Sequence, residues 1–313
     1  MDQQGNEYDV SGTVDTTDPE AVNEEVGRVY LNLYPGSSPS TIERAFLDVT
    51  ALYRGKREGF HACDTPYHDM QHVFGVTLAM ARLIDGFERT RGVGERLGAE
   101  LFQLGVVTAL FHDCGYVRRL DDEVHRTGGE LTLTHVSRGA QFLKEYLPTI
   151  GMGEVAYIAA ALIHFTGYEI PVWRIQMPSL RYRLLGGLLG SADIIAQMSD
   201  RCYLEKCRDR LYPEFVDGGI ARKRLPGGAE EIVFSSGDDL VLKTAKFYVR
   251  ASQRLESDLG GVHRFAEQHF SGHDLYIEHV RKNVEFAKSL EANHDTSVLK
   301  RVPPDTLTLE ARD

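Results

Sequence analysis

Apolar residues recur at helical spacing along most of the chain. In "SPSTIERAFLDVTALYRG" they place Ile42, Phe46, Val49 and Leu52–Tyr53 on one stripe, after a Ser/Pro/Thr start that is typical of a helix N-terminus. The same spacing predicts further helices in "EVGRVYLNLY", "QHVFGVTLAMARLIDGF", "GERLGAELFQLGVVTALFHDCG", "THVSRGAQFLKEYL", "GEVAYIAAALIHFTGY", "SLRYRLLGGLLGSADIIAQMSDRCYLEKCRDRLYPEF", "DDLVLKTAKFYVRASQRLESDLGG" and "DLYIEHVRKNVEFAKSLEAN". No alternation of strands with helices and no internal repeat interrupts this pattern.

This pattern predicts an all-α fold with one domain of roughly ten helices over residues 25–296. A Gly- and Pro-rich stretch at about 216–237 predicts a loop insertion, with a short hairpin at "EEIVF". Residues 1–24 are polar and acidic, so we expect a disordered tail there. We expect residues 297–313 to form a C-terminal tail.

Composition narrows the classes of partner. The chain has 313 residues, 42% hydrophobic and 26% charged, which is ordinary for a soluble protein. A net charge of −11 predicts repulsion of long nucleic acid and of anionic membranes, so a phosphate-bearing substrate needs a local positive centre. No apolar run of membrane-spanning length and no leader pattern is visible, and we expect no membrane partner. The four cysteines form no C-x-x-C pair, which favours reduced thiols and a cytoplasmic location.

Two short stretches carry candidate metal ligands. "YHDMQHVFGV" holds His68 and His72, whose spacing of four would place both side chains on one face of a helix. His112 and Asp113 close the strongly apolar stretch "VVTALFHDCG". Two ionisable groups in such surroundings are unfavourable unless a partner holds them, and a divalent metal ion is one such partner. The alternative is that each of these residues is an ordinary hydrogen-bonded group.

Further polar residues stand near these stretches or in similar settings. Asp193 interrupts the apolar run "LLGGLLGSADIIAQM", where it needs a cation or a dense set of hydrogen bonds. Gln197 lies one turn later and could contact substrate or orient a ligand. Arg118 and Arg119 could bind a substrate phosphate, or pair equally well with the acidic surface.

The order of these residues resembles the HD superfamily of metal-dependent phosphohydrolases. His72, then His112–Asp113, then Asp193 follow one another on predicted helices of an all-α chain. "YHDMQH", which begins at Tyr67, is similar to the H-N-x-x-H helix of class I cyclic-nucleotide phosphodiesterases, with Asp in place of Asn. "LGSADII" resembles the segment that carries their last aspartate ligand. The resemblance covers residues from about 60 to 205, and by it Tyr67 is also a candidate substrate contact.

Two more histidines extend the resemblance to the dinuclear HD proteins. His135 begins "HVSRGAQFL", which is similar to the H-x-x-x-G-A helix start of HD-GYP and related proteins, and His164 ends an apolar helix as a histidine does there. The resemblance then implies a six-ligand site for two metal ions, with the HD aspartate bridging them: His72, His112, Asp113, His135, His164 and Asp193. The alternatives are that His135 is a plain helix-start residue, and that His164 is a cation at a helix end.

The chain also departs from both families. Tyr116 stands where HD-GYP proteins have Lys and class I phosphodiesterases have a further His. "HFTGYEIP" lacks the double His and the G-Y-P of HD-GYP proteins. Gln268 and Phe270 do not have the spacing of the Gln–Phe pair that clamps the base in class I enzymes. The resemblance therefore predicts the metal chemistry more directly than it predicts the substrate.

The expected activity follows from this resemblance. Two divalent transition-metal ions (Fe, Mn, Zn, Co or Ni, with Mg as an option in one site) would share a hydroxide that attacks a small nucleotide phosphodiester of the cyclic-nucleotide type. Asp113 would be both ligand and catalytic residue, and His68 would protonate the leaving group. The alternatives are a mixed-valent diiron oxygenase of the HD type, a nucleotide phosphomonoesterase, and, last, a non-enzymatic sensor or scaffold.

Overall fold

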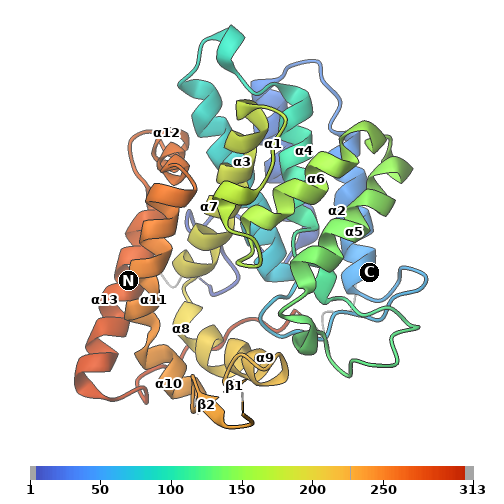
Figure 1. The fold of residues 1–313 in the computed structure, drawn as a ribbon. Coiled ribbons are helices and arrows are strands. Elements are labelled where there is room, and N and C mark those ends of the chain that lie inside the picture. The colour runs from blue at the N-terminus through green and yellow to red at the C-terminus, as the bar shows by residue number, and fades with distance from the viewer. Residues whose placement is uncertain (1–4, 226, 307–313) are drawn as a thin grey trace.

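The predicted all-α fold is confirmed in the computed structural model, which describes residues 5–225 and 227–306 (Figure 1). Helices dominate, and the strands within the described ranges form one small antiparallel sheet. The elements are α1 (Pro19–Leu33), α2 (Ser40–Tyr53), α3 (Met70–Arg89), α4 (Ala99–Leu110), α5 (His135–Tyr146), α6 (Ala156–Leu162), α7 (Leu180–Ser199), α8 (Tyr203–Lys206), α9 (Tyr212–Asp217), β1 (Arg222–Arg224), β2 (Glu230–Ile232), α10 (Gly237–Leu242), α11 (Thr244–Gln253), α12 (Phe265–His269) and α13 (Leu275–Asn293).

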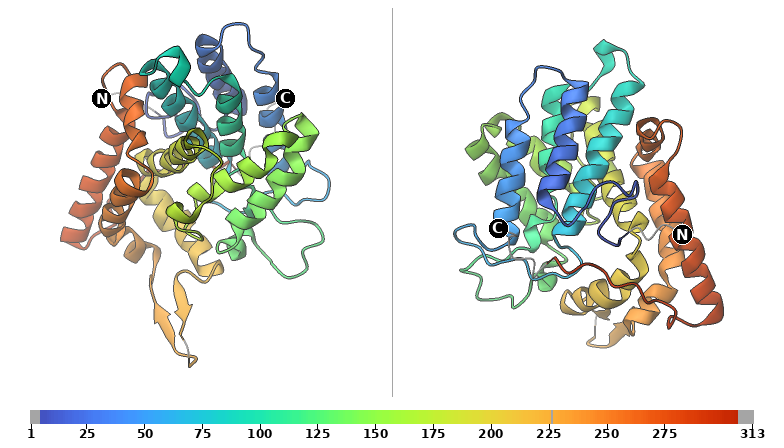
Figure 2. Two further views of the ribbon diagram at one scale, coloured as in Figure 1. Left: turned by 45° about the horizontal axis from the view of Figure 1, so that its top comes forward. Right: turned by 180° about the vertical axis from the view of Figure 1, so that it is seen from behind.

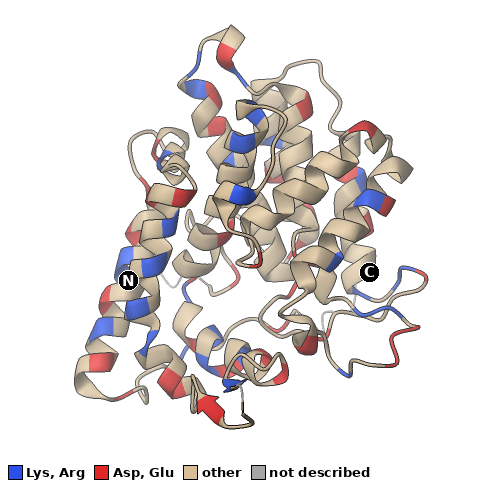
Figure 3. Cartoon of the chain, in the orientation of Figure 1, with Lys and Arg blue, Asp and Glu red and all other residues tan. Residues whose placement is uncertain are grey.

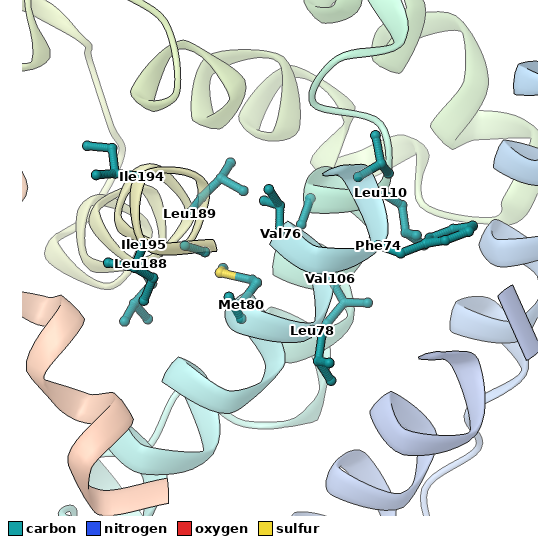
Figure 4. Close-up of a cluster of buried hydrophobic side chains, with 14 of the residues drawn as sticks. Phe74, Val76, Leu78, Met80, Val106, Leu110, Leu188, Leu189, Ile194 and Ile195 are labelled. Carbon is teal, nitrogen blue, oxygen red and sulfur yellow. The ribbon is translucent and has the colours of Figure 1, made fainter. Parts of the chain in front are cut away.

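The core forms around α3, which packs against α1, α4, α7 and α12. α3 is buried at nearly every position from Met70 to Glu88, and its charged residues Arg82 and Glu88 are buried with the apolar ones. α7 crosses beside it and contributes Leu188, Leu189 and Ile195 to the same cluster as Met80 (Figure 4). α3 and α7 carry candidate ligands, and α4 directly precedes two more. The packing of this core therefore fixes the backbone positions of those residues.

The N-terminal segment corrects the expectation of a disordered tail, as far as residues 5–24 are concerned. α1 begins at Pro19, with Pro in the first turn and the Asp18 side chain accepting a hydrogen bond from the Glu20 N–H. Before it, Tyr8 and Asp15 form an isolated bridge. The Asp9 carboxylate lies 2.6 Å from Nη1 of Arg82, and both side chains are almost fully buried. The acidic composition suggested solvation, but one of these acids neutralises a cation inside the core.

Removing this buried partner should destabilise the whole domain. Asp9→Ala leaves the Arg82 guanidinium with the Tyr276 hydroxyl at 3.1 Å and no carboxylate in its place. An unpaired buried charge of this kind lowers the free energy of unfolding by about 3–5 kcal/mol. Urea denaturation followed by circular dichroism measures the change, with Glu24→Ala at an exposed position of α1 as the matched control. Equal stability of the two variants would contradict the structural role of this segment.

The predicted loop insertion contains the expected short hairpin. Arg222 pairs with Ile232 in antiparallel register, and the hairpin projects from the body of the domain (Figure 2). Its neighbours in the chain, α9 and α10, pack against each other. The hairpin is therefore mounted on the helical layer that faces the candidate site.

The described part of the C-terminal tail, residues 297–306, runs along the domain rather than away from it. Arg210 donates hydrogen bonds to the carbonyl oxygens of Pro303 and Pro304, at 3.0 and 2.6 Å. The Thr306 hydroxyl donates to Asp69 Oδ2 at 2.6 Å. Asp69 caps the N-terminus of α3, so this segment braces the start of the helix that carries His72. The remainder of the predicted tail, 307–313, lies outside the described residues.

Charged residues of both signs are interspersed and lie mainly on the peripheral segments of the chain, while the central helices carry fewer of them (Figure 3). In the described part of the chain, no helix combines the length and the apolar character that crossing a membrane requires.

Candidate metal centre

Three predicted ligands converge in the interior. The Nε2 atoms of His72 and His112 are 3.2 Å apart, and Oδ2 of Asp113 lies 3.1 Å from each. All three residues are buried. Among the described residues, they form the group of His, Cys, Asp and Glu whose ligand atoms lie mutually close enough to hold one metal ion.

The chain positions these ligands by local structure at two helix ends. α4 ends at Leu110, so His112 and Asp113 lie in the turn after the helix and not within it, which corrects the expected helix boundary. The next turn (Cys114–Tyr116) contacts the start of α5, where a Cβ at Gly115 would lie 1.8 Å from the His135 carbonyl oxygen. Only glycine permits this approach, and it brings His135 to the far side of Asp113.

Asp113 faces both halves of the predicted site. Its Oδ2 is directed to His72 and His112, and its Oδ1 lies 3.6 Å from His135 Nε2. Burial alone would raise the pKa of this carboxyl, but His112 and the hydrogen bonds from both histidines hold the pKa well below its usual range. The carboxylate is therefore ionised, with one oxygen toward each side, as a bridging ligand requires.

The ring tautomers suit metal binding. His112 Nδ1 lies 2.8 Å from the Ala109 carbonyl oxygen, and His135 Nδ1 lies 2.7 Å from that of Thr132. A carbonyl only accepts, so each Nδ1 carries a proton, and Nε2 is the ring atom left to bind a metal ion once it is deprotonated. Burial lowers the pKa of His112, but Asp113 outweighs it and raises that pKa to about 9, so a metal ion at this position would replace a proton on Nε2. The donor set of two imidazoles and a carboxylate thus fits a divalent transition-metal ion.

Asp193, on α7, completes this side of the cluster. Its Oδ1 lies 3.6 Å from His72 Nε2 and 3.9 Å from His112 Nε2. The Gln197 amide donates to the same oxygen at 3.2 Å, and the Tyr67 hydroxyl donates to the Gln197 carbonyl oxygen at 3.2 Å. Tyr67 and Gln197 were expected to contact substrate. They line the cavity, but their hydrogen bonds form a chain that orients Asp193, which was the alternative for Gln197.

His68 reaches the site by a different route from the one expected. α3 begins at Met70, with Asp69 as its cap accepting from the His72 N–H, so His68 lies in the turn before the helix and shares no helical face with His72. Its Nδ1 lies 2.5 Å from Oε2 of Glu214, a buried residue of α9. Burial lowers the pKa of His68, but the Glu214 carboxylate outweighs it and leaves the pKa raised.

Glu214 was not found from the sequence. It stands 146 residues from His68, in a segment whose pattern indicated only a helix. Its Oε1 also accepts from the Tyr67 N–H at 2.6 Å. An acid between Phe and Pro in "LYPEFV" is the one weak signal, and it names no partner.

Tyr116 stands where the resemblance implied Lys or His. Its ring stacks against two histidines, His68 and His135, with centroids 4.3 Å apart in each case. Burial raises its pKa well above the usual range, so the phenol stays neutral. The stacking holds both His68 and His135 against the Tyr116 ring, with the two imidazole centroids 6.3 Å apart, and both histidines line the cavity.

The remaining candidates lie farther out. His164 Nδ1 lies 4.0 Å from a carboxylate oxygen of Glu169. Within the described part of the chain His164 makes no hydrogen bond or ion pair with the other predicted ligands, so its ligand role stays a prediction. Arg118 pairs with Asp64 at 3.1 Å, and Arg119 with Asp121 at 3.2 Å. Neither arginine lines the cavity, so the structure does not bring them to the candidate site. Both pair with acidic residues instead, which was the alternative.

The comparisons with known proteins place this cluster in a family. The family model described as Npun_R2479-like matches residues 43–258, more than half of the chain. The chain belongs to the Npun_R2479-like family. All six predicted ligands, together with His68 and Glu214, lie within the Npun_R2479-like region, whereas α1, α12 and α13 lie outside it. No curated protein and no solved structure gives a significant match to the chain.

Proposed function

We propose that this protein is a metal-dependent phosphohydrolase that cleaves a small phosphodiester. The observation that carries the proposal is the convergence of His72, His112 and Asp113 near a second pair, His68 and Glu214. His72, Asp113 and His68 line the same cavity. A metal cluster alone would suit storage or sensing. A histidine with a raised pKa next to it adds the group that protonates a leaving oxygen.

The residues present fit the implied metal ions. His72, His112, Asp113 and Asp193 would hold one ion, and Asp113 with His135 would begin a second site, to which the resemblance adds His164. When bound, such ions supply an activated water and neutralise phosphoryl oxygens. In a chain of net charge −11, this supplies the local positive charge that an anionic substrate needs.

The chain's own residues account for the other half of the reaction. Glu214 holds the Nδ1 proton of His68, so the imidazolium presents its Nε2 proton to the cavity. Tyr116 fixes the ring plane by stacking. A departing alkoxide needs a proton, and His68 provides it without leaving its partner. The family resemblance favours a cyclic-nucleotide-type substrate, which stays a prediction.

Oxygen tracing tests the reaction class. We expect hydrolysis under anaerobic conditions, with ¹⁸O from labelled water appearing in the phosphate product of a cyclic nucleotide or of bis(p-nitrophenyl) phosphate. Phosphomonoesters serve as the comparison that separates diester from monoester cleavage. An absolute requirement for O₂, with label entering an oxidised product from the gas, would replace this proposal with the diiron oxygenase alternative.

A further inference from the structure

The candidate metal site opens into a chamber much larger than a phosphate group. The cavity has a volume of about 820 Å³, with His72, Asp113, His135 and Asp193 on one side. The opposite wall comes from α8 to α11 and from Val233 and Phe234, which directly follow the hairpin. Of these elements, α8, α9 and α10 lie at the lower end of the molecule (Figure 1). Cavities of about 300–1,000 Å³ typically enclose a whole small-molecule ligand. The chamber therefore has room for the non-reacting part of the substrate.

Four polar side chains on the wall already make hydrogen bonds within the protein. The hydroxyls of Thr132, Thr166 and Thr244 each donate to a backbone carbonyl three or four residues back in the chain, at 2.6, 2.8 and 3.2 Å. The Gln197 amide is bonded at both ends, to Tyr67 and to Asp193. The Gln197 amide is therefore not free to pair with the edge of a nucleobase, and a buried polar group without a partner costs about 1–3 kcal/mol.

The rest of the wall is apolar. Ile194 and Met198 of α7 face Leu211, Phe215, Phe234 and Leu240 across it. A hydrocarbon group that packs against these side chains is stabilised by about 0.8 kcal/mol for each methylene removed from water. The wall thus favours an apolar group over a nucleobase.

We propose that the substrate is an amphipathic phosphoester, whose anionic group lies at the metal cluster and whose hydrocarbon or aromatic arm fills this chamber. The reaction at the anionic end rests on the proposed function, whereas the arm rests on the chamber wall alone. Lys246, which pairs with Glu291 at 3.4 Å, and Arg250 of α11 also line the cavity and are exposed, so they place positive charge on its wall. This narrows the substrate from small phosphodiesters in general to those with a bulky apolar substituent.

Binding of simple phosphonates tests the arm without requiring turnover. Isothermal titration of Mn²⁺-loaded protein with ethyl, butyl, hexyl and octyl phosphonate should show affinity rising about fourfold per methylene until the chamber is full. Val233→Trp places a large ring in the chamber wall and should flatten the series. Ile232→Trp, at the neighbouring hairpin residue that does not line the chamber, is the matched control and should keep the wild-type slope.

The outcomes separate the arm from the reaction. A wild-type slope that Val233→Trp alone removes supports the proposal. Affinity independent of chain length in the wild type, with a cyclic nucleotide binding more tightly than octyl phosphonate, overturns it without reference to any variant. If the slope is present but no phosphodiester with an alkyl or aryl arm is hydrolysed, the amphipathic ligand stands and the proposed reaction fails.

Discussion

Replacing Asp113 with alanine is expected to remove the bound metal entirely. Asp113 lies at the contact between the two halves of the site, since its Oδ2 is 3.1 Å from both His72 and His112 and its Oδ1 is 3.6 Å from His135. Loss of a residue that only orients a ligand weakens metal binding by about 10–100-fold, so loss of a shared ligand should exceed about 100-fold. Elemental analysis of purified protein measures this, and hydrolysis should disappear with the metal.

The metal content of the parent protein and of a matched variant serves as the control for this result. We expect close to two transition-metal ions per chain in the parent and in Asp121→Ala, which alters an exposed carboxylate that pairs only with Arg119. Two ions in Asp113→Ala would contradict the bridging assignment. A parent with one ion would restrict the site to His72, His112, Asp113 and Asp193, and would give His135 another role.

His68→Ala is expected to keep the metal and to lose activity selectively. The residue faces the cavity but is not one of the predicted ligands, and its Nδ1 is held by Glu214 at 2.5 Å. Loss of a general acid slows cleavage by about 10²–10⁴-fold when the leaving group is an alkoxide. The aryloxide of an aryl phosphodiester is a good leaving group that needs little protonation. Cleavage of such a substrate should therefore change far less. Equal losses on both substrates would assign His68 to metal binding or substrate positioning.

A pH profile of Glu214→Gln tests the same pair without removing the imidazole. Glu214 opposes the effect of burial and raises the pKa of His68. Without that charge the pKa falls, so His68 loses its proton at lower pH and the descending limb for alkyl substrates shifts to lower pH. Gln can still accept the hydrogen bond from the Tyr67 N–H. An unmoved limb with full activity would mean that another group supplies the proton.

Local pattern was sufficient for the long helices because most of them bury apolar positions that their own sequences display, whereas the short helix α12 was not predicted. The stripe of Ile42, Phe46 and Val49 is buried in α2 as expected, and the apolar run before His112 forms the buried α4. The ligands His72, His112 and Asp113 were identifiable because ionisable residues in apolar surroundings require a partner. The same argument failed for residues 5–24, since their composition resembles a solvated tail, whereas Asp9 neutralises Arg82 inside the core.

What the sequence by itself determined is therefore the all-α class and the inner candidate ligands. The tertiary structure decided which other groups join them. Glu214 pairs with His68 across 146 residues, and Gly115 allows the turn after Asp113 to approach His135. It also separated Arg118 and Arg119 from the cavity and enclosed a chamber with walls from distant helices. Such contacts depend on how helices pack, and helical periodicity records only which face of a helix is buried, not what covers it.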